Sequence, residues 1–257
     1  MRRRELLAAL ASLGLTVGPL RLRPASAQGV APIAFCRLRI QGLPEPRPGA
    51  VETIVADVRS NSSVMVAADV AEVAPDSAQI FDYPFLTLSG DRGFGPLNDR
   101  AVANLRLYLR EGGFLFIDDA SGLDGSAFDR SVRRTVERVL PGAPLRAVGR
   151  DHVVYRSFFV LRGIAGRIMV KDHLEGAWVG DITPILYSQN DLLGCLMRAP
   201  GGSWALDVVP GGPRQRTEAR KLGINLALFA LTGNYKLDVV HVETLLDRMR
   251  RQGGYGR

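Results

Sequence analysis

One segment in the middle of the chain alternates between strand-like and helix-like patterns, and it restricts the fold more than any other. Residues 83–89 are typical of a strand buried on both faces, and residues 97–111 carry apolar residues at helical spacing until two glycines end the pattern. The apolar run at residues 114–117 predicts a second strand, and residues 126–140 predict another amphipathic helix. A strand, a helix and a strand in this order form a parallel crossover. The segment therefore predicts an α/β fold, a three-layer sandwich with a mostly parallel central sheet.

The rest of the chain continues this alternation less regularly. Further strands are expected at residues 33–40, 63–67, 177–179 and 182–188, and further helices at residues 49–59, 214–230 and 240–251. Residues 151–159 look like a loop that leads into a short helix. No linker interrupts the pattern, and a chain of 257 residues is long enough to bury an ordinary core. We therefore expect one domain over residues 28–257.

The first 27 residues are predicted to be an export signal. Three arginines at positions 2–4 precede an apolar run at residues 6–20, and Ala-Ser-Ala at residues 25–27 matches an A-x-A cleavage site. The sequence R-R-E-L-L at residues 3–7 resembles the twin-arginine export consensus. The apolar run has about 15 residues, which is short of the roughly 20 that a membrane-spanning helix needs. We expect cleavage, a periplasmic mature protein and no stable membrane span after cleavage.

Charge and cysteine content argue against two classes of protein. The whole chain has a net charge of +7, but residues 1–27 hold five arginines and one glutamate, so the mature chain carries +3. Its arginines are scattered over predicted helices without interleaved aromatic residues, so we expect no binding of nucleic acid. Cys36 and Cys195 are far apart in sequence and lie among apolar residues, which rules out a zinc cluster. A single disulfide and two buried thiols both remain open.

Six segments taken jointly make the chain resemble a known family. They are residues 81–90, 107–119, 151–159, 174–176, 187–191 and 231–238. On these residues the chain resembles, from about Phe35 to Arg251, the bacterial domain-of-unknown-function family 4159, whose fold is similar to the class I glutamine amidotransferase-like sandwich of flavodoxin-like topology. The resemblance implies that fold and an exported bacterial setting, and it carries no established reaction.

The wider resemblance to amidotransferases also concerns the nucleophile. Active members place a catalytic cysteine on a tight turn after a strand, and in this chain Asp118 and Asp119 stand at that turn. No cysteine and no G-x-S-x-G elbow occur there, so the expected acyl-transfer nucleophile is missing. Cys195 follows a different strand among leucines, and we do not expect glutaminase activity.

Acidic and polar residues gather at predicted strand ends and in later loops. Ligands of open α/β sheets bind at the carboxyl ends of the strands, so these residues are candidate ligand contacts. The candidates are Asp118, Asp119, Asp151, His152, Glu175, Asn190 and Asp191. Among them Asp118, Asp119 and His152 are candidates for acid/base catalysis or for binding Mg²⁺, Mn²⁺ or Ca²⁺, although no cofactor is firmly implied. The structural alternative is that one aspartate caps the following helix and the other accepts hydrogen bonds from loop amides.

Three functions follow from these observations. The first is a non-catalytic domain that binds a small ligand, a metal or a protein partner in the cell envelope. The second is a hydrolase that acts on a cell-envelope substrate through Asp118, Asp119 and His152, which requires His152 and one aspartate within about 3 to 4 Å of a shared cleft. The third is a component of an envelope complex that docks through an apolar stripe on the last helix. That stripe consists of Val242, Leu245, Leu246 and Met249.

Overall fold

The computed structural model describes residues 32–252, with side chains described as far as residue 232. The expected signal segment and the apolar stripe on the last helix lie outside these described parts. The strands are β1 (Ile33–Leu38), β2 (Val66–Val73), β3 (Phe85–Gly90), β4 (Phe114–Asp119), β5 (Arg146–Ala147), β6 (Glu175–Val179) and β7 (Ile182–Ser188). The α-helices are α2 (Ala50–Asn61), α3 (Asp99–Arg110), α4 (Ala127–Val139) and α5 (Gly212–Gln252). Three short 3₁₀ helices are η1 (Ala78–Asp82), η2 (Val153–Arg156) and η3 (Leu193–Cys195).

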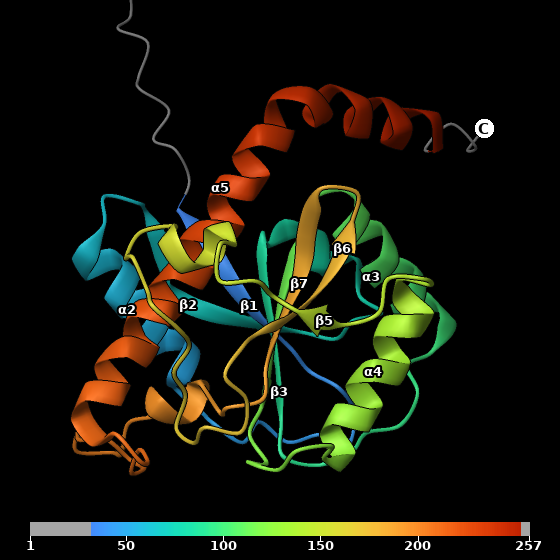
Figure 1. The fold of residues 1–257 in the computed structure, drawn as a ribbon. Coiled ribbons are helices and arrows are strands. Elements are labelled where there is room, and N and C mark those ends of the chain that lie inside the picture. Colours follow the sequence, from blue (N-terminus) through green and yellow to red (C-terminus); the bar gives the residue numbers. More distant parts are fainter. Residues whose placement is uncertain (1–31, 253–257) are drawn as a thin grey trace, which may run out of the picture. The chain divides into compact units, whose positions relative to one another are not determined.

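The seven strands of the described chain form one mixed sheet in the order β2-β1-β3-β4-β7-β6-β5 (Figure 1). The strands β2, β1, β3, β4 and β7 pair in parallel, whereas β6 is antiparallel to both β7 and β5. The chain is therefore an α/β protein, as predicted, but one edge of its sheet is antiparallel. The sequence predicts the strand at residues 177–179, which is part of β6, but not its direction, and it does not predict β5, whose two residues carry too little pattern.

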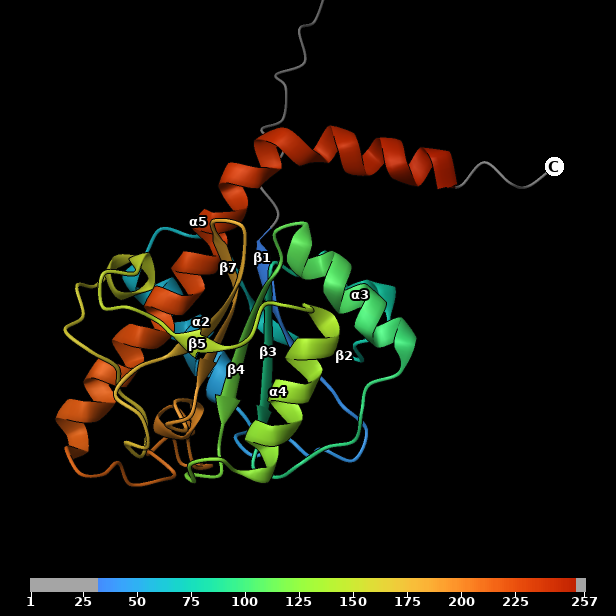
Figure 2. The same ribbon diagram turned by 45° about the vertical axis from the view of Figure 1, so that its right-hand side comes forward.

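Helices cover both faces of the sheet (Figures 1 and 2). α2 and α5 pack on one face, where the rings of Phe35 and Phe85 stack with centroids 4.5 Å apart. α3 and α4 pack on the other face against alternate residues of the same strands, among them Leu86 and Ile117. β3 and β4 are buried along their whole length because both of their faces are covered. This arrangement is the three-layer organisation that the unbroken apolar strands predicted.

Local signals explain where the helices begin. Asn98 caps α3, because its side-chain oxygen accepts a hydrogen bond from the N–H of Ala101 at 2.8 Å. Ser126 caps α4 in the same way through the N–H of Asp129 at 2.9 Å. Both starts agree with the predicted helices within one or two residues.

Two elements differ from the sequence expectations. The strand expected at residues 63–67 is β2 at Val66–Val73, because this edge strand has a mixed burial pattern that weakens its apolar signal. The helices expected at residues 214–230 and 240–251 belong to one helix, α5.

Cys36 and Cys195 are buried and unpaired, so the structure holds the two thiols and no disulfide between them. Burial raises the pKa of each thiol to about 12, which keeps both protonated at neutral pH. Among the described residues no helix is long and apolar enough to cross a membrane.

Candidate functional site

Asp118 ends β4 on the face that α2 and α5 cover, and its side chain is fully buried. The strand register places Ser89 on one side of it and Ser188 on the other. Its carboxylate oxygens accept hydrogen bonds from the N–H groups of Leu192 and Leu193, each at 2.8 Å. Burial and the nearby charge of Asp191 together raise the pKa of Asp118 to about 8. Asp118 therefore ties the end of β4 to the turn that follows β7.

Asp119 is also fully buried, one residue further along β4. One oxygen accepts a hydrogen bond from the N–H of Ser121 at 2.8 Å. The other accepts hydrogen bonds from the Ser126 hydroxyl at 2.6 Å and from the Tyr187 hydroxyl at 3.3 Å. Since Ser126 is the cap of α4, Asp119 holds that cap in place. The hydrogen bonds to loop amides agree with the structural alternative, but the cap of α4 is Ser126 and not an aspartate, because Asp119 contacts the helix start only through the Ser126 hydroxyl.

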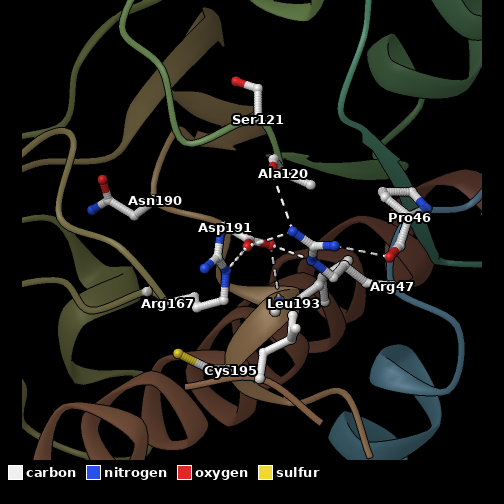
Figure 3. Close-up of polar contacts among 12 residues, drawn as sticks. Pro46, Arg47, Ala120, Ser121, Arg167, Asn190, Asp191, Leu193 and Cys195 are labelled. Carbon is white, nitrogen blue, oxygen red and sulfur yellow. Dashed lines mark hydrogen bonds and ion pairs between the residues drawn. The ribbon is translucent and has the colours of Figure 1, made fainter. Parts of the chain in front are cut away.

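Asp191 is the centre of a buried ion-pair network (Figure 3). Arg47 meets its carboxylate with two hydrogen bonds, from Nε at 2.8 Å and from Nη2 at 2.7 Å. The Nε of Arg167 donates to the same carboxylate from the other side, and the N–H of Gly194 adds a bond at 3.1 Å. Arg47 also donates to the carbonyl of Ala120 at 3.1 Å. The Asp191 carboxylate therefore joins three segments that are distant in sequence, and Arg47 links them to a fourth at Ala120.

The backbone of Asp191 adapts to this position. Its φ of 52° lies in the left-handed region, and among the described residues it is the one non-glycine residue with positive φ. Aspartate and asparagine tolerate this region better than most side chains. Strained turns after strands often carry nucleophiles, but this carboxylate is buried and engaged by two arginines. Its geometry indicates a structural role.

Asn190 and Glu175 lie at the same end of the sheet. The Asn190 side chain accepts hydrogen bonds from the N–H groups of Val170 and Lys171 at 2.8 Å, and it donates to the carbonyl of Lys171. Glu175 pairs with Tyr187 in the sheet and accepts a bond from Arg133 at 2.6 Å. The structure thus brings Asp118, Asp119, Glu175, Asn190 and Asp191 to one edge, as predicted, although Glu175 begins the antiparallel strand β6 instead of lying in a loop.

Asp151 and His152 lie elsewhere. The Nε2 of His152 is 3.1 Å from the hydroxyl of Thr183, near the start of β7, while its Nδ1 accepts from the N–H of Val154. Thr183 is five residues before Ser188, which is the neighbour of Asp118 in the sheet. Thr183 and Ser188 are therefore about 15 Å apart along the strand. Burial lowers the pKa of His152, so its ring is neutral at pH 7. The structure does not assemble Asp118, Asp119 and His152 into one site.

The same residues are also the candidates for binding a metal ion. Within the part of the chain that the structure describes, no group of three or more histidine, cysteine or acidic side chains is arranged to hold a metal ion. The oxygens of Asp118 and Asp119 are already occupied by N–H and hydroxyl donors of the protein. These two carboxylates therefore have no open side toward solvent.

A crevice opens at the same end of the sheet, between the loops that follow β1, β2 and β3. Its volume is about 910 Å³, and it is lined by residues 39–44 after β1, residues 74–76 after β2 and residues 95–98 before and at the start of α3. The chain leaves β1 toward β2 but leaves β3 toward β4 in the opposite direction, so the sheet changes its winding direction between β1 and β3. Open α/β sheets bind ligands outside such a switch point. We name this space the switch-point crevice.

No residue that lines the switch-point crevice is among the candidate site residues predicted from the sequence. Arg39, Gln41, Asp76 and Asn98 supply polar groups, and prolines and leucines form the remaining wall. The signal that points to it is the pair of turns that follow β1 and β3, one rich in proline and one rich in glycine. Turns of this kind leave space that a side-chain pattern does not reveal.

The structure is an α/β domain with a mixed seven-stranded sheet in the described chain and a crevice between loops at one end of that sheet. The family model for Domain of unknown function (DUF4159) matches residues 35–231, which is most of the chain. The chain belongs to this family. No curated protein matches it.

Proposed function

We propose that the protein is a non-catalytic binding module with an amidotransferase-like fold, and that its ligand occupies the switch-point crevice. The observation that carries this proposal is a contrast at one edge of the sheet. The acidic side chains that hydrolysis would use are fully buried and bonded to the protein, whereas the neighbouring crevice is open and lined by mixed groups. A binding site of this kind needs no nucleophile.

Strand order supports the amidotransferase-like fold. The parallel strands run β2-β1-β3-β4-β7, which is the flavodoxin-like order 2-1-3-4-5 with an antiparallel edge added beyond β7. Asp118 and Asp119 are the last two residues of β4, at the place where an amidotransferase would carry its cysteine. Cys195 is no substitute, because burial raises the pKa of its thiol to about 12 and the nucleophile of such enzymes is the thiolate.

The crevice walls indicate the chemistry of the ligand. Pro44, Pro75 and Leu97 form apolar walls, while Arg39 and Asp76 place opposite charges on two of the bordering segments. The volume lies within the range of roughly 300 to 1,000 Å³ that small-ligand sites occupy. A zwitterionic ligand with an apolar part, such as a short peptide, fits this combination. We place this ligand in the periplasm, following the twin-arginine-type signal at residues 1–27.

Gly95 provides a direct test. It lines the crevice, and no atom lies within 4 Å of the position that its Cβ would take, so Gly95→Phe fills the space without a steric clash. Gly201→Phe is the matched control, because Gly201 also faces open space but lies outside the crevice. Melting temperatures of the purified proteins are measured with a panel of di- and tripeptides and with Mg²⁺, Mn²⁺ and Ca²⁺.

We expect at least one peptide to raise the melting temperature of the wild type and of Gly201→Phe but not of Gly95→Phe, because binding to the native state raises the midpoint by mass action. The proposal fails if no peptide acts on the wild type, or if a peptide acts equally on Gly95→Phe. A cation that stabilises the wild type but not an Asp118→Asn/Asp119→Asn variant would instead support the metal-dependent hydrolase.

A further inference from the structure

A second pocket lies at the far edge of the sheet, beyond β5. It has a volume of about 200 Å³ and is bordered by residues 147–150, by residues 161–163 and by Asp172 and His173. β5 is four strands away from β3 in the sheet, which places this pocket roughly 20 Å from the switch-point crevice. The two spaces share no residue. We name this space the edge pocket.

Two arginines dominate the charge of the edge pocket. Arg150 is held by a hydrogen bond from its Nη1 to the carbonyl oxygen of Arg162 at 2.8 Å. The same Nη1 lies 4.0 Å from the position of a Cβ on Gly163, so the guanidinium stands over a glycine at the pocket wall. Among the residues that the structure describes, neither Arg150 nor Arg162 forms an ion pair through its guanidinium. Both positive charges are therefore free to meet an anion.

The acidic group at the pocket is already engaged. The carboxylate of Asp172 is 2.7 Å from Nδ1 of His173. This contact is the main reason why the pKa of Asp172 is lowered, and Arg150 adds a smaller effect of the same sign. Among the residues that line the edge pocket, the two arginines face one acidic side chain, Asp172, so the lining carries an excess of positive charge.

Neutral groups at the pocket add directional hydrogen bonding. Tyr155 is buried, and its hydroxyl oxygen accepts the N–H of Leu174 at 3.4 Å, which leaves its proton for another acceptor. Burial raises the pKa of this hydroxyl, so it remains a donor at neutral pH. Gly163 carries no side chain into the pocket, whereas beside Gly149 the carboxylate of Asp151 takes the space of a side chain, with its Oδ1 2.6 Å from the position of a Cβ.

We propose that the edge pocket binds a small oxyanion, a carboxylate or a phosphate group, between Arg150 and Arg162 with Tyr155 as a further donor. Guanidinium groups present paired N–H donors that match the geometry of carboxylate and phosphate oxygens. The pocket volume accommodates the anionic group with a short attached chain. This site is separate from the switch-point crevice, and its occupant need not be the ligand proposed there.

Titration calorimetry with the purified protein tests the proposal. The probes are inorganic phosphate and succinate, titrated at constant ionic strength with chloride so that general charge screening is the same in each run. The two probes distinguish a phosphate site from a carboxylate site. We expect saturable binding of at least one of them to the wild type, with one site per chain.

Two variants act on the pocket in different ways. Arg150→Ala/Arg162→Ala removes the charge, and Gly163→Phe fills the space while both arginines remain. We expect each variant to weaken binding at least tenfold. Arg100→Ala and Gly201→Phe are the controls, because Arg100 is exposed on α3, Gly201 faces open space, and both lie outside the pocket. Both controls should bind as the wild type does.

Melting temperatures separate loss of binding from loss of folding, because Gly163→Phe should melt as the wild type does. The proposal is overturned if neither probe binds the wild type. It is also overturned if binding persists unchanged in either pocket variant, or if Arg100→Ala weakens it as much as the double variant does.

Discussion

Asp191 is the residue whose loss should damage the fold most for the smallest change in shape. Asp191→Asn keeps the size of the side chain and a residue type that tolerates the left-handed φ of 52°, so it removes little except the negative charge. Asp191 is fully buried, while the side chains of Arg47 and Arg167 are 15% and 22% exposed. Removing one partner of a buried ion pair costs about 3–5 kcal/mol because the other charge stays buried without compensation.

The partial exposure of both arginines places the expected loss near the lower limit, at about 3 kcal/mol. For a domain of this size that corresponds to a fall in melting temperature of roughly 6 to 12 °C. Urea denaturation and calorimetry measure both quantities. Asp124→Asn is the control, since its ion pair with Lys171 is largely exposed and should change the midpoint very little. A loss of less than about 1 kcal/mol for Asp191→Asn would refute the structural role that we assign to this carboxylate.

Three further predictions concern other buried polar groups. The pKa of Asp118 is raised to about 8, so the folded chain keeps a proton that the unfolded chain releases near pH 4. The free energy of unfolding should therefore fall between about pH 4 and pH 8. Urea titrations at pH 5 and pH 8 should show this fall for the wild type but not for Asp118→Asn. Ser126→Ala should cost about 1–2 kcal/mol in urea denaturation, because it removes the cap of α4 and a hydrogen bond to Asp119; an unchanged midpoint would contradict this. Asn225→Leu should cost about 3 kcal/mol in the same assay, because the Asn225 side chain satisfies three backbone groups, two of them on Phe159 and one in η2. A loss below about 1 kcal/mol would count against this prediction.

Local patterns predicted the elements whose signal is continuous. β3, β4, α3 and α4 appear where apolar runs, helical spacing and capping residues placed them, because each of these signals acts within a few residues of sequence. The edge strands β2 and β5 were shifted or missed, since a half-exposed strand and a strand of two residues carry little pattern. Element positions also brought five of the seven candidate residues to one edge: four follow or end parallel strands, and Glu175 lies there because it begins the antiparallel strand β6.

What these residues do there depends on partners that sequence position does not reveal. Asp191 bonds to Arg47, which is 144 residues away, and Asp118 bonds to amides more than 70 residues away. Such pairs form only when the crossovers have closed, so no local pattern could show that the carboxylates are already occupied. Closeness in sequence is no guide either: His152 is close to acidic residues in sequence, but its ring contacts the beginning of β7.

The buried acidic groups also affect the loops around the end of the sheet. A buried carboxylate is tolerated only when donors surround it, so the chain uses Arg47 and Arg167 on Asp191, whereas Asp118 keeps a proton below about pH 8 and also accepts hydrogen bonds from loop amides. These bonds fix the loops around the end of the sheet. Loops that are already ordered lose less entropy when a ligand binds, so a rigid edge favours a preformed site beside it. The acidic network fixes the segments around Arg47, Arg167 and Leu193 at the same end of the sheet as the switch-point crevice, so under the function that we propose its carboxylates order this end of the sheet and leave ligand contacts to other residues.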